Sequence, residues 1–163
     1  MAEQMSVAEL SALIRATSTR LELLLAQLSV AEMNQPGAVG VWSVKDVLAH
    51  LAFWNRYAMN VLHSIARGET PELGADDETE RNNASVVAQY YQRPLAAVIA
   101  DWQQAREDLL DAIEDLDDEA LNNPNYFPWS AGRSLLDRIG GNSFEHEQEH
   151  IEQIRAWMNE HKG

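Results

Sequence analysis

Apolar residues recur at steps of three and four residues along most of the chain, and this spacing constrains its fold more than any other feature. Following Ser6, the residues of one such series are Leu10, Leu13, Ile14, Leu21, Leu24, Leu25 and Leu28. No segment shows a convincing alternation of apolar and polar residues, which is the pattern of a half-buried strand. The spacing therefore predicts an all-α protein made of amphipathic helices.

Capping motifs mark where the first two long helices begin. Ser6 with Glu9, and Ser43 with Asp46, have the spacing of a capping box, in which each side chain accepts a hydrogen bond from the other residue's backbone N–H. The second helix is predicted to end just before Gly68, because glycine readily adopts the left-handed conformation that terminates a helix.

A long connection and a third helix are predicted next. Residues 69–81 are acidic and contain Pro and Gly, so they are interpreted as a crossover loop. The third helix is predicted to begin near Asn82. Pro94 either kinks this helix or starts a second segment, because proline lacks the backbone N–H that a helix interior requires. A short helical turn is expected at residues 117–121.

The last part of the chain is predicted to form a loop and a final helix. Residues 122–133 are rich in aromatic residues and contain Pro and Gly, as in a loop. A helix is predicted over residues 134–161, with a bend at Gly140-Gly141, because glycine costs about 1 kcal/mol against alanine in a helix interior. Four long helices predict a four-helix bundle with a long crossover between helices 2 and 3, as a single domain over residues 1–163.

The charge of the chain argues against several classes of partner. With 26 Asp and Glu against 12 Lys and Arg, the net charge is -14, so we expect neither nucleic acid nor an anionic membrane surface as a partner. No basic leader and no membrane span is evident, which makes the cytoplasm the expected location. The chain has no cysteine, which excludes a thiolate ligand or a cysteine nucleophile.

At 100° per residue along the predicted helices, the five histidines point in different directions. His50 lies within the apolar arc of the second helix, and His146 and His150 lie on the apolar face of the last helix, four residues apart. His63 is expected to face solvent, whereas His161 points roughly inward but lies near the chain end.

Three inward imidazoles on two helices are the donor set of a metal site. Residues four apart on a helix can reach one ion, and His50 would supply the third ligand from a facing helix. Three protein ligands leave one coordination position open, as in catalytic sites. The alternative is that the histidines are hydrogen-bonded core residues, but a buried trio would then need polar partners in an apolar core.

Further site residues are weaker candidates. Trp54 and Tyr57 follow His50 on its helix, and Trp129 lies in the loop before the last helix, so all three are candidates to line a substrate mouth. Aromatic residues at such spacing more often pack in the core. Glu147 flanks the inward face and is a candidate acid or base, although a glutamate in that position is more often solvated.

Two segments carry a resemblance to a known family. The first is residues 35–51, QPGAVGVWSVKDVLAHL, and the second is residues 142–157, NSFEHEQEHIEQIRAW. They resemble the entry to helix 2 and the H-x-x-x-H-x-x-Q-I signature of helix 4 in the DinB/YfiT-like superfamily. Within it, the sequence is most similar to the ClbS/DfsB-like group.

The resemblance implies a four-helix bundle with a long crossover, often a homodimer. Its three-histidine site corresponds to His50, His146 and His150, and relatives are known with nickel, zinc or iron. Characterised relatives include thiol-dependent S-transferases and isomerases that use bacillithiol, mycothiol or glutathione. The ClbS-like group includes a self-resistance protein that opens an electrophilic cyclopropane.

These features lead to three functional hypotheses. In the first, the chain is a metal-dependent enzyme, a transferase or hydrolase that acts on an electrophilic small molecule. Because the chain lacks cysteine, a thiol nucleophile would have to be a low-molecular-weight cosubstrate. In the second, the bundle binds or sequesters a small molecule without chemistry. In the third, it is a structural bundle whose histidines bind metal adventitiously.

Overall fold

The computed structural model describes residues 3–74 and 78–162, and these residues form helices and no strand. The helices are α1 (Val7–Leu25), α2 (Val30–Asn34), α3 (Val44–Ala66), α4 (Glu78–Tyr90), α5 (Leu95–Glu114), α6 (Asp118–Asn122), α7 (Leu135–Asn142) and α8 (Phe144–Lys162), with a 3₁₀ turn at Pro128–Ser130. The prediction of an all-α protein is confirmed.

The capping motifs start helices where the sequence predicts them. The Oγ atoms of Ser6 and Ser43 each accept a hydrogen bond of 3.1 Å from the backbone N–H three residues later, and both boxes are complete. Helix α3 ends before Gly68, whose φ of 72° is a left-handed conformation. The short helix α2, which was not predicted, begins with a third capping box of Ser29 and Glu32.

The predicted third helix is two helices. Helix α4 begins at Glu78, four residues before the predicted start at Asn82, and residues 75–77 of the predicted crossover loop lie outside the described residues. Of the two alternatives for Pro94, the structure has the second: Pro94 is the N-cap of α5. A proline fits there because the first residues of a helix need no intrahelical N–H bond.

The predicted last helix is also interrupted, but at a different residue from the expected one. The break between α7 and α8 lies at Ser143, whose φ and ψ are -130° and -103°. Gly140 contributes through close packing, since a Cβ atom there would lie 3.1 Å from the ring of Phe144. The glycine therefore allows the start of α8 to fold tightly against α7.

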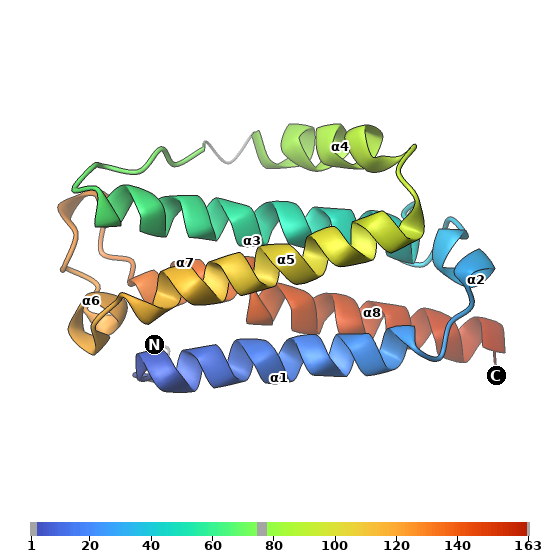
Figure 1. Cartoon of the computed structure of the whole chain (residues 1–163), viewed down its shortest axis with the longest axis horizontal. Coiled ribbons are helices and arrows are strands. Elements are labelled where there is room, and N and C mark those ends of the chain that lie inside the picture. The colour runs from blue at the N-terminus through green and yellow to red at the C-terminus, as the bar shows by residue number, and fades with distance from the viewer. Residues whose placement is uncertain (1–2, 75–77, 163) are drawn as a thin grey trace.

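The bundle consists of α1, α3, α5 and the consecutive pair α7 and α8. Figure 1 shows that α3 and α5 run in the same direction, because the chain returns along α4 before it enters α5. Helix α4 lies on the outside of α3 rather than in the bundle, and α1 packs beside α8 (Figure 1). The predicted bundle with a long crossover is therefore present, and the crossover contains a helix of its own.

Two hydrophobic clusters fill the bundle, one toward each end. The first joins α3, α5 and α8 with the end of α1 and includes Leu48, Trp102 and Ile154, all fully buried. The second lies where α6 and α7 close the other end and includes Leu10, Leu109 and Leu135. The apolar faces of α3 and α8, which carry the inward histidines, therefore meet within the bundle.

An ion pair between Arg56 and Asp101 joins the two parallel helices, and its loss is expected to destabilise the protein. Two guanidinium nitrogens of Arg56 donate to the Asp101 carboxylate at 2.8 and 2.9 Å, and the side chains are 31% and 17% exposed. Burial alone would raise the pKa of Asp101, but the hydrogen bonds and charge of Arg56 outweigh it and lower that pKa. We expect Asp101→Asn to cost about 1 to 2 kcal/mol near neutral pH.

The pH dependence follows from the sign of this shift. Because the pKa is lower in the folded state, the pair stabilises the protein above about pH 4, and the contribution is lost as pH falls through the folded pKa. Urea unfolding at several pH values measures it, with Glu69→Gln as control, since Glu69 forms an exposed pair with Arg67. Equal stability losses for the two variants would contradict the expectation.

Candidate metal centre

The three inward histidines predicted from the sequence meet at one point between α3 and α8. The Nε2 atom of His146 lies 2.7 Å from Nε2 of His50 and 3.1 Å from Nε2 of His150. The ligand atoms of the three lie within 4.8 Å of one another. Of the other histidines, His63 is exposed as expected, whereas His161 is exposed although it was expected to point roughly inward.

Hydrogen bonds cannot satisfy these three nitrogens together. The Nδ1 hydrogen of His150 donates to Oε1 of Gln153 at 2.6 Å, which leaves a lone pair on its Nε2. If Nε2 of His146 carries a hydrogen, that hydrogen can be donated fully to Nε2 of only one neighbour, His50 or His150. If it carries none, its lone pair faces the lone pair on Nε2 of His150. With a lone pair on Nε2 of His50, its buried Nδ1–H has no hydrogen-bond partner among the described residues.

A divalent cation fits this donor set, because it would accept all three lone pairs at once. Metal–nitrogen distances of about 2.0–2.1 Å separate neighbouring ligand nitrogens by about 3.3 Å in tetrahedral geometry. The separations of 2.7 and 3.1 Å are slightly smaller, so small rotations of the imidazoles would accommodate an ion. Three imidazoles suit zinc, nickel and iron.

Burial keeps the three imidazoles neutral. It lowers the pKa of His50 to about 4, assisted by the charge of His150 and opposed by a contact with Asn83. The pKa of His146 falls to about 3, through burial and the charges of the other two histidines, and burial also lowers the pKa of His150. Neutral imidazoles have the lone pairs that a metal ion requires.

A cavity of about 400 Å³ opens onto the histidines. Its wall includes Trp42, Asn83 and Asn142, none of which is predicted from the sequence to be a site residue. The Trp42 ring lies 4.9 Å from the His50 ring, and the indole N–H of Trp54 donates to Oδ1 of Asn83 at 2.8 Å. The crossover helix α4 therefore supplies one side of the cavity.

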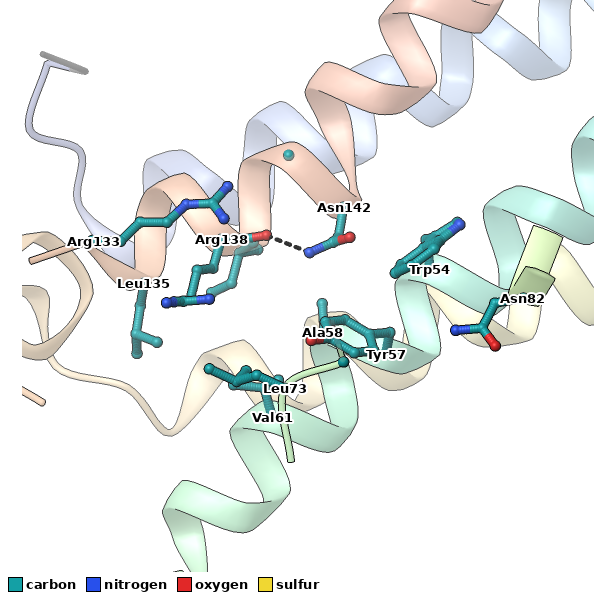
Figure 2. A pocket seen from close by; sticks show the side chains of 13 residues that line it. Trp54, Tyr57, Ala58, Val61, Leu73, Asn82, Arg133, Leu135, Arg138 and Asn142 are labelled. Atoms are coloured by element: carbon teal, nitrogen blue, oxygen red, sulfur yellow. Dashed lines mark hydrogen bonds between the residues drawn. The ribbon is translucent and has the colours of Figure 1, made fainter. Parts of the chain in front are cut away.

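A second pocket adjoins this cavity along α3. It has a volume of about 220 Å³ and shares Trp54, Gly141 and Asn142 with the cavity around the histidines. Figure 2 shows Trp54 and Tyr57 lying on one side of it and two arginines of the α7 region on the other. Of the three predicted substrate-mouth residues, Trp54 therefore lines both spaces and Tyr57 lines the second pocket.

The third predicted substrate-mouth residue, Trp129, contacts a residue of the pocket wall but does not line the pocket. The Trp129 ring packs 5.2 Å from the ring of Phe127, and the guanidinium of Arg138 lies over it at 5.7 Å. Trp129 lines neither of the two cavities. Trp129 therefore packs against Arg138, which lines the second pocket.

Glu147 is buried rather than solvated. It is 2% exposed, because α1 covers this face of α8, and Ser18 Oγ of α1 donates to its carboxylate at 2.8 Å. Burial raises the pKa of Glu147 to about 7. The residue does not line the cavity around the histidines, and the carboxylate of this candidate acid or base contacts α1 instead.

Comparisons with known proteins agree with this architecture. The family model of the DinB superfamily matches residues 13–154. DfsB, a sibling lethal factor precursor, has a TM-score of 0.84 at 18% identity, with 98% of each chain covered. An uncharacterised protein from Escherichia coli UTI89 has a TM-score of 0.82 at 18% identity, covering 99% of this chain and 96% of that one. No curated protein matches the sequence.

A further comparison corrects the expectation about nucleic acid. ClbS, a colibactin self-resistance protein in complex with double-stranded DNA, has a TM-score of 0.79 at 18% identity, covering 97% of this chain and 98% of ClbS. The expectation that nucleic acid is not a partner, which was based on the net charge of -14, is therefore wrong. Net charge averages over the whole surface, whereas DNA contacts depend on local charge and shape.

Within residues 3–74 and 78–162, no helix has the length and apolar character needed to cross a membrane.

Proposed function

The chain belongs to the DinB superfamily, and from that premise we propose that it is a metal-dependent enzyme that acts on electrophilic small molecules. His50, His146 and His150 are the proposed ligands of one divalent ion, zinc, nickel or iron. The reaction is transfer of a low-molecular-weight thiol to the electrophile, or hydrolysis. The proposal treats residues 1–163 as one domain.

One observation carries the proposal. Three neutral imidazoles direct their Nε2 atoms to a common point on the wall of a cavity, and hydrogen bonds cannot satisfy them together. Structural metal sites are usually closed by four protein ligands, whereas three ligands beside a cavity leave room for a reactant. The geometry therefore favours a catalytic centre over a structural one.

Residues of the chain would prepare this centre for a reaction. A bound divalent ion would lower the pKa of water or of a thiol, so that either is a nucleophile near neutral pH. Gln153 holds the ring of His150 in the tautomer that presents Nε2 to the site. Trp42 and Trp54 lie in the wall of the cavity and would offer aromatic surface to an apolar substrate.

Proteins of the same fold support the choice of substrate class. ClbS is a self-resistance protein against colibactin, and DfsB is described as a sibling lethal factor precursor. A protective role against a reactive small molecule is consistent with the first of these. The absence of cysteine from the chain means that a thiol nucleophile must come from solution.

Conjugation of a thiol to a general electrophile tests the proposal. Metal-loaded protein without a histidine tag is incubated with chlorodinitrobenzene and glutathione, bacillithiol or mycothiol, and conjugation is followed by absorbance. We expect turnover that is lost in His50→Ala and kept in His63→Ala, because His63 is exposed and outside the site. Saturable binding of the electrophile by loaded protein without turnover would instead favour the non-catalytic binding bundle.

Substitution of Gln153 should weaken metal binding. Its carbonyl oxygen accepts the Nδ1 hydrogen of His150, and loss of such a partner typically lowers metal affinity about 10–100-fold. We expect this loss for Gln153→Ala, measured by competition with a chromogenic zinc chelator. Glu152→Ala is the matched control, because Glu152 is exposed on the same helix. Unchanged affinity in Gln153→Ala would contradict the assigned tautomer.

Duplex DNA and a second copy of the chain are partners to test. ClbS is in complex with double-stranded DNA, so a fluorescent duplex should be titrated with this protein at low and physiological salt. Saturable binding that weakens with salt would indicate phosphate contacts. The family resemblance also leads us to propose a homodimer, which light scattering of the purified protein tests.

A further inference from the structure

Two arginines are the only charged residues among the described residues that line the second pocket. Arg133 and Arg138 share that wall with apolar and amide side chains, and no Asp or Glu is among the described lining residues. The chain as a whole has 26 acidic and 12 basic residues. A pocket with this local excess of positive charge is therefore unlike the average surface of the molecule.

Neither guanidinium is neutralised by a carboxylate of the described residues. Arg138 donates to Oγ and to the backbone oxygen of Ser130, at 2.8 and 3.0 Å, and Arg133 makes a long contact of 3.5 Å with the backbone oxygen of Asp137. No ion pair involves either arginine within the described part of the chain. The two like charges therefore lie near each other without a counter-charge.

The arrangement has an electrostatic cost that an anion would remove. Burial lowers the pKa of Arg138, and the charge of Arg133 lowers it further. Ser130 holds the Arg138 side chain through Nε and Nη2, so within the described residues its Nη1 donors are left without a protein acceptor. A guanidinium held in this way is already oriented to bind a carboxylate or phosphate.

The position of the pair connects it to the candidate metal centre. A Cβ atom on Gly141 would lie 3.5 Å from Nη2 of Arg133, and Gly141 lines both the second pocket and the cavity around the histidines. Trp54 and Tyr57 lie across the pocket from the arginines (Figure 2). A ligand in this space would meet cationic groups on one side and aromatic surface on the other.

We infer that Arg133 and Arg138 form an anion-binding subsite that receives an acidic group of the reacting small molecule. The inference rests on the proposed function and names its substrate class: a molecule with an apolar or aromatic body and a carboxylate, phosphate or sulfonate at one end. The subsite would bind the acidic group while the rest of the molecule extends past Trp54 toward the histidines.

A matched pair of ligands tests the subsite without requiring catalysis. 3-Phenylpropanoate and its neutral amide, 3-phenylpropanamide, have the same aromatic body and differ in charge, and titration calorimetry measures both. We expect the carboxylate to bind at least about tenfold more tightly, because hydrogen bonds to charged groups contribute more than neutral ones. The preference should disappear in the double variant Arg133→Gln/Arg138→Gln and persist in Arg155→Gln, a surface arginine on α8 that lines neither cavity.

A variant of the metal centre separates this inference from the proposed function. His146→Ala/His150→Ala removes two of the three candidate ligands, so carboxylate preference in that variant cannot come from a metal ion. We expect the preference to remain there. Equal binding of the two ligands to the unmodified protein, or an unchanged preference in the double arginine variant, would overturn the subsite. Absence of thiol transfer by the metal-loaded unmodified protein, with the carboxylate preference intact, would count against the proposed function alone.

Discussion

Replacing His146 with alanine is expected to lower the affinity for zinc at least about 100-fold. His146 lies between the other two candidate ligands, and its Nε2 atom is 2.7 Å from Nε2 of His50 and 3.1 Å from Nε2 of His150. Loss of a hydrogen-bond partner of a ligand costs about 10–100-fold, so loss of the ligand itself should exceed that range. Competition with a zinc chelator measures the affinity, and circular dichroism checks that the helices remain.

His63→Ala is the matched control for this variant. His63 lies on α3 with His50 but is exposed, so its removal should leave zinc affinity unchanged. Equal affinity in His146→Ala and the unmodified protein would contradict a site built on the three histidines. Equal losses in both variants would point to nonspecific binding by histidines of the surface.

Replacing Trp102 with alanine is expected to lower the free energy of unfolding by about 3–5 kcal/mol. Trp102 lies in the middle of α5, is 0% exposed, and belongs to the cluster that joins α3, α5 and α8. Its removal loses buried apolar area and leaves a cavity that rigid neighbouring helices cannot close. Because small proteins are stable by about 5–15 kcal/mol, this one change would remove a large part of the total.

Urea unfolding measures the loss, with Tyr91→Ala as a matched aromatic control. Tyr91 is 69% exposed, so its replacement should change the stability little. Trp102→Phe, which keeps part of the buried ring, should lose less than Trp102→Ala and remains measurable if the alanine variant does not fold. A loss below about 1 kcal/mol for Trp102→Ala would contradict the packing around α5.

Local signals in the sequence were sufficient for the helices but not for their exact breaks. Ser6 and Ser43 cap helices as predicted, because a capping box is a contact between residues three positions apart. Pro94 allowed two outcomes, and packing of α4 on the outside of α3 decided between them. The break at Ser143 depends on how Phe144 packs against Gly140, which no local pattern reveals.

Some residues of the candidate site could be predicted from local sequence patterns, and others could not. Helical periodicity placed His50, His146 and His150 on inward faces, and their convergence follows from the packing of α3 near α8. Periodicity did not reveal Asn83 or Arg138, because the crossover helix and the α7 region reach the site only through tertiary packing. Glu147 was misjudged as solvated because the position of α1 over that face is also a tertiary feature.

The most direct test of the metal centre is an X-ray absorption spectrum of tag-free protein loaded with zinc and then dialysed. We expect about one zinc per chain with three imidazole nitrogens in its first coordination shell, at about 2.0–2.1 Å. Retained zinc with fewer than three imidazoles, or no zinc retained after dialysis, would contradict the assignment of His50, His146 and His150 as its ligands.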